Sequence, residues 1–246
     1  MKKIVLIVLL LAASVGSAHA QTAEFTRSYA AANNAYRDGK YDDAIAGYET
    51  VLKHGFESGP LYYNLGNSYF KKQQFGKALV NYERARRLMP RDLDLMANSQ
   101  FAASEVQNHV PFTLSPWQKL WQRHIEFYSR DEMVLIISVL LIFLGAAHLL
   151  VLYFGWKTGR LAMGGFAVLF LIFAYGLQMK LSADRDAGIL IKTAAARFEP
   201  SDKATIYFEL PVGQRVQVHE REGGWAKIER PDGKAGWVSE ESLEGI

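Results

Sequence analysis

The sequence predicts a multi-domain membrane protein with a helical-repeat solenoid, a transmembrane helical hairpin and a C-terminal all-β domain. Three observations lead to this fold class. A 34-residue period runs through residues 21–110. Two uncharged apolar runs, residues 133–154 and 161–179, follow it. Residues 181–246 then alternate short apolar-polar segments with turn residues, which is typical of short β-strands.

The composition narrows the classes of function. The chain of 246 residues has no cysteine, which excludes disulfides, thiol catalysis and cysteine-zinc sites. Residues 21–110 carry 11 Lys/Arg against 10 Asp/Glu, and residues 180–246 carry 10 against 12, so neither region is a basic nucleic-acid surface. The sequence contains no phosphate loop, no G-x-S-x-G and no H-E-x-x-H motif. We therefore expect no enzyme, no cofactor and no metal site.

Residues 1–20 have the pattern of an export signal. Lys2 and Lys3 are followed by an apolar run over residues 4–13, and small residues stand at Ala18 and Ala20, where a signal peptidase reads them. Cleavage is expected after Ala20, and an uncleaved N-terminal anchor is the alternative. Either way, the residues that follow are expected on the outer side of a bacterial inner membrane, in the periplasm.

Residues 21–110 contain two helical-repeat units. The turn at residues 39–44 aligns with residues 73–78 at an offset of 34, and Tyr48 aligns with Tyr82. A third first-helix, Leu93–Glu105, is expected to cover the end of the stack with an apolar face of Leu93, Met96, Ala97 and Phe101. The second unit resembles the tetratricopeptide repeat (TPR) family through Tyr62, Leu65, Gly66, Tyr69, Ala78, Tyr82, Ala85 and Pro90.

The TPR resemblance implies a concave groove, lined by the first helix of each unit, that binds a protein partner. Asparagine side chains can bind a peptide backbone there, and aromatic rings offer flat apolar area. Asn33 and Asn67 occupy equivalent places and are the strongest candidates; the alternative for the aromatic residues is packing between repeats. The candidate groove residues are Tyr29, Asn33, Tyr36, Arg37, Tyr63, Asn64, Asn67, Phe70 and Lys71.

Residues 111–131 are expected to form an amphipathic helix. Apolar residues from Trp117 to Tyr128 recur at helical spacing, and polar residues occupy the other face. Two tryptophans just before a membrane span favour a helix in the lipid headgroup layer. Packing against the repeat stack is the alternative.

Residues 132–180 are expected to form a hairpin of two membrane spans. Runs of 22 and 19 residues suit a bilayer core of about 30 Å. The six residues 155–160 between them carry two positive charges and no negative one, which favours the cytoplasmic side. Both soluble regions would then lie outside the cytoplasm. His148 has no carboxylate partner within the spans, so a proton relay is not expected.

Residues 181–246 are expected to form a small β-barrel. Turn residues such as Gly213 and Gly233 separate five or six short strands. Together with Trp225 and the Gly236-Trp237-Val238 segment, this pattern resembles the bacterial SH3 family. That resemblance implies a peptide-binding, wall-binding or assembly role, and core packing is the alternative for at least half of the candidates. The candidate groove or core residues are Tyr207, Phe208, Trp225 and Trp237.

The order of the parts resembles the BatE family of the Bacteroides aerotolerance system, including the ending at residues 236–246. The resemblance implies membrane partners with von Willebrand A domains, an indirect link to a MoxR-type ATPase, and a role in oxidative stress tolerance. Taken together, the sequence predicts a noncatalytic scaffold bound to the lipid bilayer. A peptidoglycan-binding anchor that uses the SH3-like domain is the alternative, and a transporter subunit is disfavoured by the uncharged hairpin.

Overall fold

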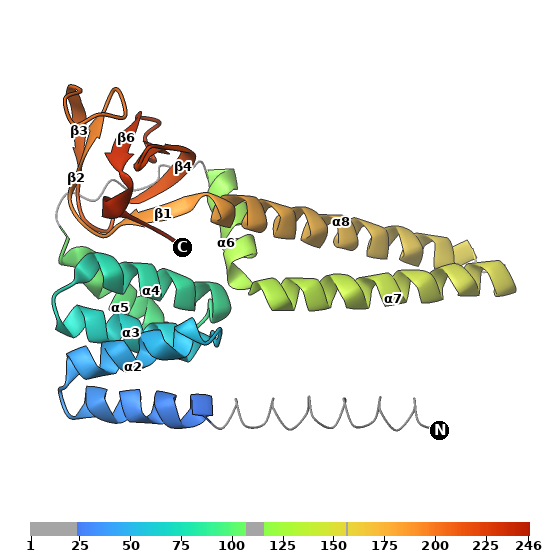
Figure 1. Cartoon of the computed structure of the whole chain (residues 1–246). Coiled ribbons are helices and arrows are strands. Elements are labelled where there is room, and N and C mark those ends of the chain that lie inside the picture. Colours follow the sequence, from blue (N-terminus) through green and yellow to red (C-terminus); the bar gives the residue numbers. More distant parts are fainter. Residues whose placement is uncertain (1–23, 107–115, 156) are drawn as a thin grey trace, which may run out of the picture.

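The computed structural model describes residues 24–106, 116–155 and 157–246 (Figure 1). The expected signal peptide lies outside this range. Residues 24–37 are helical, and four further helices complete a stack that we call the helical-repeat domain (residues 24–106). These helices are α2 (Tyr41–Lys53), α3 (Gly59–Lys71), α4 (Phe75–Leu88) and α5 (Leu93–Ser104).

Local sequence explains where several helices begin. The Ser58 side chain accepts a hydrogen bond from the Leu61 N–H at the start of α3, and Asp92 caps α5 in the same way. Ser129 and Glu132 form a reciprocal capping box at the next major helix, α7 (Arg130–Phe154). Each cap satisfies backbone N–H groups that the first turn of a helix leaves unpaired.

Small residues allow the two helices of each repeat unit to pack closely. A Cβ on Gly66 would lie 2.7 Å from the Tyr82 ring. In the first unit, Ala32 stands at the position equivalent to Gly66. The glycine that allows the close approach in this unit is Gly47, on the second helix, α2. A Cβ on Gly47 would lie 2.8 Å from the Ala32 Cβ. The same close approach is thus achieved from the opposite helix.

The predicted packing face of α5 is wrong. Leu93, Met96 and Phe101 are 78%, 51% and 57% exposed, whereas Leu95 and Ala102 are buried. The repeat period explains the difference, because Leu95 stands 34 residues after Leu61, which is buried too. Packing in the stack therefore follows the repeat register and not the most apolar stripe of the isolated helix.

Within the described residues, two helices are long and apolar enough to cross a membrane, α7 and the segment Gly159–Arg185 of α8 (Lys157–Arg185). Both extend beyond the predicted spans. The expected six-residue loop is also shorter than predicted, because Gly155 ends α7 in the left-handed conformation and α8 begins at Lys157. The two helices lie side by side and point away from the helical-repeat domain (Figure 1).

Helix α6 (Pro116–Phe127) crosses the end of α8. The Trp121 ring lies 5.9 Å from that of Tyr175, and the His124 and Tyr128 rings each lie 5.4 Å from that of Phe173. The helix therefore packs mainly on the hairpin. The C-terminal half of α6 also contacts the helical-repeat domain, where Glu126 of α6 lies 3.4 Å from Arg86 of α4.

The C-terminal region, here called the β-domain (residues 187–246), is one antiparallel sheet in the order β3-β2-β6-β5-β4-β1-β7. The expected small β-barrel is not shown as a closed one, because β3 and β7 are edge strands without a pairing to each other. Strand β7 and a short 3₁₀ turn, Glu240–Ser242, were not expected from the sequence. The strands are β1 (Ala187–Leu190), β2 (Ala194–Arg197), β3 (Ile206–Leu210), β4 (Arg215–Glu222), β5 (Trp225–Glu229), β6 (Ala235–Ser239) and β7 (Leu243–Gly245).

The β-domain packs directly on α4 (Figure 1). Ile189 of β1 is buried within the apolar cluster of the helical-repeat domain. A Cβ on Gly76 would lie 2.7 Å from the Ile191 Cα, and a Cβ on Gly213 would lie 2.4 Å from Leu79. Two glycines, one from each domain, thus allow this close contact.

We predict that Gly76→Ala separates the two domains without unfolding α4. Alanine has a higher helix propensity than glycine by about 1 kcal/mol, so the helix itself is favoured. The added methyl group, however, meets the Ile191 backbone, which cannot move without displacing β1. Limited proteolysis should cleave between the domains faster than in the wild type, with helical circular dichroism unchanged.

Gly145→Ala is the matched control, because a Cβ at this helical glycine has open space around it. Equal proteolysis of Gly76→Ala and the wild type would show that the contact does not hold the domains together.

Candidate functional site

A hydrogen-bond ladder joins the repeat units on the face where the groove was predicted. The Oδ1 atom of Asn33 accepts from the Tyr48 hydroxyl at 2.6 Å and from Asn64 Nδ2 at 3.0 Å. The same Asn64 nitrogen donates to the Tyr29 hydroxyl at 2.9 Å. Burial raises the pKa of Tyr48, which keeps its hydroxyl protonated and able to donate.

The ladder repeats one unit further along the stack. Asn67 Oδ1 accepts from the Tyr82 hydroxyl at 2.7 Å and from Asn98 Nδ2 at 3.1 Å, and Asn98 also donates to the Tyr63 hydroxyl at 2.7 Å. Asn98 was not predicted as a site residue. Its position, 34 residues after Asn64, was the available signal.

The ladder defines what the predicted groove asparagines can still bind. The Oδ1 atoms of Asn33 and Asn67 each accept two hydrogen bonds within the domain. The Nδ2 atoms of these two residues make no hydrogen bond to the rest of the described chain. Because two donors fix each amide plane, each remaining N–H pair is held in one orientation. The two amides can therefore donate to carbonyl groups of a ligand.

The other predicted groove residues form a repeating aromatic and basic pattern. The Tyr36 ring packs 5.5 Å from Tyr41, and the Phe70 ring lies 5.5 Å from both Phe75 and Phe101. Aromatic residues thus line equivalent points of successive units, and Phe101 extends the row. From the sequence, Phe101 was expected to cover the end of the stack instead.

Arg37 and Lys71 are exposed and are separated by one repeat period. Arg37 donates to the neighbouring Asn34 side chain. The third equivalent position is an exposed acid, Glu105. The first two units therefore present one cation each at this position, next to the aromatic row.

The structure separates the predicted aromatic candidates of the β-domain. Trp237 is buried, with the Lys227 ammonium 5.8 Å from its ring centroid. Phe208 packs against the core of the sheet, beneath the Arg230 guanidinium at 5.0 Å. Trp225 is half-buried at the start of β5. Trp237 and Phe208 thus contribute to the packing of the sheet.

Tyr207 is the predicted β-domain residue that faces solvent, and it belongs to an exposed aromatic pair. Phe198 is 60% exposed, Tyr207 is 46% exposed, and their ring centroids lie 4.7 Å apart. Ile206 is exposed beside them on the edge strand β3. Phe198 and Ile206 were not predicted, although their apolar side chains flank a turn marked in the sequence by Pro200.

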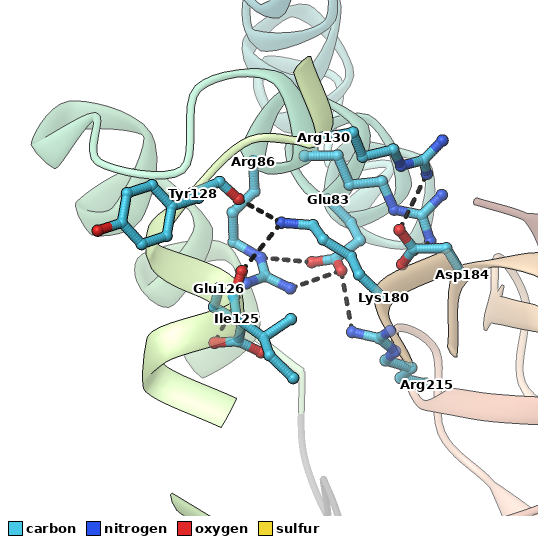
Figure 2. A network of polar contacts seen from close by, with 10 residues as sticks. Glu83, Arg86, Ile125, Glu126, Tyr128, Arg130, Lys180, Asp184 and Arg215 are labelled. Atoms are coloured by element: carbon cyan, nitrogen blue, oxygen red, sulfur yellow. Dashed lines mark hydrogen bonds and ion pairs between the residues drawn. The ribbon is translucent and has the colours of Figure 1, made fainter. Parts of the chain in front are cut away.

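A charged junction joins α4, the β-domain and the hairpin (Figure 2). Glu83 is central to it. Its carboxylate accepts two hydrogen bonds from Arg86, at 2.7 and 2.9 Å, and one from Arg215 of β4 at 2.9 Å. Burial alone would raise the pKa of Glu83, but the hydrogen bonds and charges of Arg86, Arg215 and Arg87 lower it to about 2.

A second acid links α4 to the hairpin. Asp184 of α8 lies 3.0 Å from Arg87 and 2.9 Å from Arg130, with its side chain only 11% exposed (Figure 2). Nearby, the Lys180 ammonium donates to the carbonyls of Tyr128, at 2.6 Å, and Ile125, at 3.3 Å. Lys180 thereby satisfies carbonyls at the C-terminal end of α6.

Two more arginines complete the junction. Arg84 of α4 contacts Glu244 at 2.8 Å and the Gly245 carbonyl at 2.7 Å, both in β7. Arg91 pairs with Glu132 and donates to the Phe127 carbonyl at 2.8 Å. These residues cannot be assigned to a site from the sequence, because arginines on a helix face have the same pattern whether they are solvated or packed against another domain. The junction consists of the contacts made by Glu83, Arg84, Arg86, Arg87, Arg91, Arg130, Lys180, Asp184 and Arg215.

The ladder and the junction are built from hydrogen bonds and ion pairs between structural elements. Across the described residues, no group of three or more His, Asp or Glu side chains could hold a metal ion. In the ladder, the Asn33 and Asn67 oxygens accept hydrogen bonds that join neighbouring repeat units, and in the junction each arginine lies in at least one ion pair. The ladder thus positions the repeat units, and the junction positions the domains.

Comparisons with known families agree with this interaction chemistry. The tetratricopeptide repeat model matches residues 60–92, and the bacterial SH3 domain model matches residues 192–244. Both are typically noncatalytic modules that bind proteins or, for the SH3 domain, also peptidoglycan. No curated protein matches the chain.

Glu83 should make folding stability depend on acid pH. Its pKa is about 2 in the folded state against an ordinary 4.5, so its contribution is complete above pH 4.5 and is lost as the pH falls toward 2. Glu83→Gln should lower the free energy of unfolding at neutral pH by about 3 kcal/mol, because it removes the carboxylate paired with Arg215 and one of the two paired with Arg86. The loss relative to the wild type should shrink across that acid window.

Denaturant titrations of the full chain in mild detergent, at several pH values, measure this difference. Glu222→Gln is the control, because Glu222 is exposed and lies in no ion pair among the described residues. A pH-independent difference between Glu83→Gln and the wild type would contradict the role assigned to this carboxylate.

Proposed function

We propose that this protein is a noncatalytic scaffold, anchored in the bacterial inner membrane, that binds partner proteins through the groove of its helical-repeat domain. The observation that carries the proposal is the junction. It joins the groove-bearing domain, the β-domain and one end of the apolar hairpin through compensated charges on α4. A partner bound in the groove would therefore be held at a defined position relative to the membrane.

The hairpin supports the membrane anchor. Large apolar side chains along both helices are exposed, among them Leu135, Ile142 and Leu171. Exposed apolar surface on this scale is costly in water and favourable in lipid. Helix α6 crosses the hairpin at its domain-bearing end, with Leu120 and Phe127 exposed, as suits the headgroup layer. The export signal and the basic turn support a periplasmic location for both soluble domains.

The groove favours an extended protein segment with acidic and apolar side chains. Asn33 and Asn67 would donate to its backbone carbonyls through their Nδ2 atoms. Arg37 and Lys71 would pair with acidic side chains, and the row of Tyr36, Phe70 and Phe101 would contact apolar ones. Tyr29, Tyr63 and Asn64 would act indirectly, by holding the asparagines in place.

The resemblance to the BatE family supports a more specific version of this function. The partners would be membrane proteins with von Willebrand A domains, linked indirectly to a MoxR-type ATPase. The complex would serve stress tolerance, such as aerotolerance, in the cell envelope. The turn of the hairpin offers few groups to the cytoplasm, so an internal ATPase would act through those other membrane proteins.

Peptidoglycan binding is a second candidate function, favoured by the exposed pair Phe198 and Tyr207. Aromatic rings offer flat faces for the apolar side of a sugar ring. In this case the β-domain would be the receptor, and the helical-repeat domain would support assembly.

Reversing the charge of Arg37 and Lys71 together should release the groove partner. We expect the double variant Arg37→Glu, Lys71→Glu to lose about tenfold or more of the partner cross-linked in native membranes, since two charge-assisted contacts become repulsive. Both side chains are exposed, so the domain should fold normally. Quantitative mass spectrometry of cross-linked membranes measures the partner yield.

Lys53→Glu is the control. Lys53 is exposed too, but it lies on α2, the second helix of its repeat unit, whereas the predicted groove is lined by first helices. Unchanged yields for the double variant would contradict the groove proposal. If, instead, Tyr207→Ser abolishes sedimentation of the chain with isolated peptidoglycan, the second candidate is favoured.

Membrane topology is tested by single cysteines, because the chain has none of its own. Lys53→Cys and Lys203→Cys are exposed positions in the two soluble domains, and Thr158→Cys lies between the spans. A membrane-impermeant maleimide should label the first two in intact spheroplasts and Thr158→Cys only after lysis. Labelling of Thr158→Cys before lysis would overturn the periplasmic assignment.

A further inference from the structure

An open cavity of about 780 Å³ lies where the helical-repeat domain, the hairpin and the C-terminal strand meet. Four arginines line it, two from α4, one from α7 and one from α8. This volume is within the range of small-ligand sites, and such sites favour the contacts between domains. The four are Arg84, Arg87, Arg130 and Arg185.

The carboxylates of the cavity do not fully compensate these arginines. Asp184 is shared between Arg87 and Arg130. Arg84 has Glu244, but Arg185 is exposed and has no ion pair within the described chain. The remaining acids of the lining, Glu57 and Asp131, are exposed. At the inner wall, the guanidinium groups of Arg87 and Arg130 are therefore paired with one carboxylate, that of Asp184, which leaves an excess of one positive charge there.

Hydrogen bonding at the same wall is incomplete. The Arg87 side chain is only 10% exposed, yet its Nε and Nη2 atoms have no hydrogen-bond acceptor in the part of the chain that the structure describes. Its contact with Asp184 at 3.0 Å is an ion pair without hydrogen-bond geometry. The Nε atom of Arg130 is also buried without an acceptor. Buried donors of this kind favour a ligand with several acceptor oxygens.

The cavity also has an apolar side, and it lies at one end of the hairpin. Leu88 and Leu181 line it and are about two-fifths exposed. Ser129 at the start of α7 and Arg185 at the end of α8 both contribute, so the cavity lies where the two apolar helices leave their proposed bilayer. Charged donors and exposed leucines are thus presented together at the level of lipid headgroups.

We propose that this cavity binds the phosphate group of an anionic phospholipid, with the arginines on the phosphate and the leucines on the glycerol and upper acyl chain. This inference rests on the proposed membrane anchoring. Arginine matches phosphate oxygens bidentately, and basic pockets beside membrane helices are suited to lipid headgroups. A bound lipid would connect α4 to both spans and reinforce the junction.

Native mass spectrometry of the full chain in mild detergent tests the proposal. The chain is mixed with equal amounts of phosphatidylglycerol and phosphatidylcholine, and the bound lipids are counted. We expect one phosphatidylglycerol per chain in preference to phosphatidylcholine. Arg185→Gln should weaken its retention about tenfold, as expected for loss of one charge-assisted contact. Arg160→Gln is the matched control, an exposed arginine of α8 at the far end of the hairpin.

Three results would overturn the proposal. The first is no preference for phosphatidylglycerol, and the second is an equal loss of bound lipid in Arg185→Gln and Arg160→Gln. The third is displacement of the lipid by an equal concentration of inorganic phosphate, which would assign the site to the free ion. Alkaline carbonate extraction of native membranes tests the anchoring separately. A chain that stays in the membrane but shows no lipid preference refutes the lipid site alone, whereas a chain that is extracted refutes the anchor.

Discussion

The compensation of the charges on α4 is the constraint on which the arrangement of this protein depends. Within one and a half turns, this helix carries Arg84, Arg86 and Arg87, and its own Glu83 is nearly buried among them. Such a cluster is stable only where each charge meets a partner as water is excluded. Those partners come from three other parts of the chain, namely Glu126 on α6, Asp184 on α8 and Glu244 on β7.

Because the partners belong to different elements, the junction fixes several orientations at once. Asp184 ties the hairpin to α4, while Glu83 ties β4 to the same helix through Arg215. The apolar contact at Gly76 and Gly213 places the β-domain close enough for these pairs to form. The helical-repeat domain is consequently not a module on a flexible linker but part of one packed body with the hairpin end.

In the repeat ladder, asparagine holds neighbouring units together and, in the proposed function, also binds the partner. Asn33 and Asn67 use their amide oxygens between units and keep their amide nitrogens unbonded within the described chain. Mutation of either asparagine would therefore change both the stack and the groove. Mutation of the exposed cations Arg37 and Lys71 would change the groove alone, because their side chains contribute little to the packing of the stack.

The sequence by itself determined the helical repeats, the two long apolar helices and the run of short antiparallel strands. These features depend on local patterns: a 34-residue period, uncharged runs, and alternating residues between turns. The same period places Asn98, 34 residues after Asn64, at the equivalent point of the next unit. The tertiary structure decided which face of α5 is buried, that the sheet has two edge strands, and that Trp237 is buried while Tyr207 is exposed. Only the tertiary structure revealed the junction and its cavity, because Glu83 and Arg215 are far apart in the chain. A charged helix face also has the same sequence pattern whether it faces water or an oppositely charged domain.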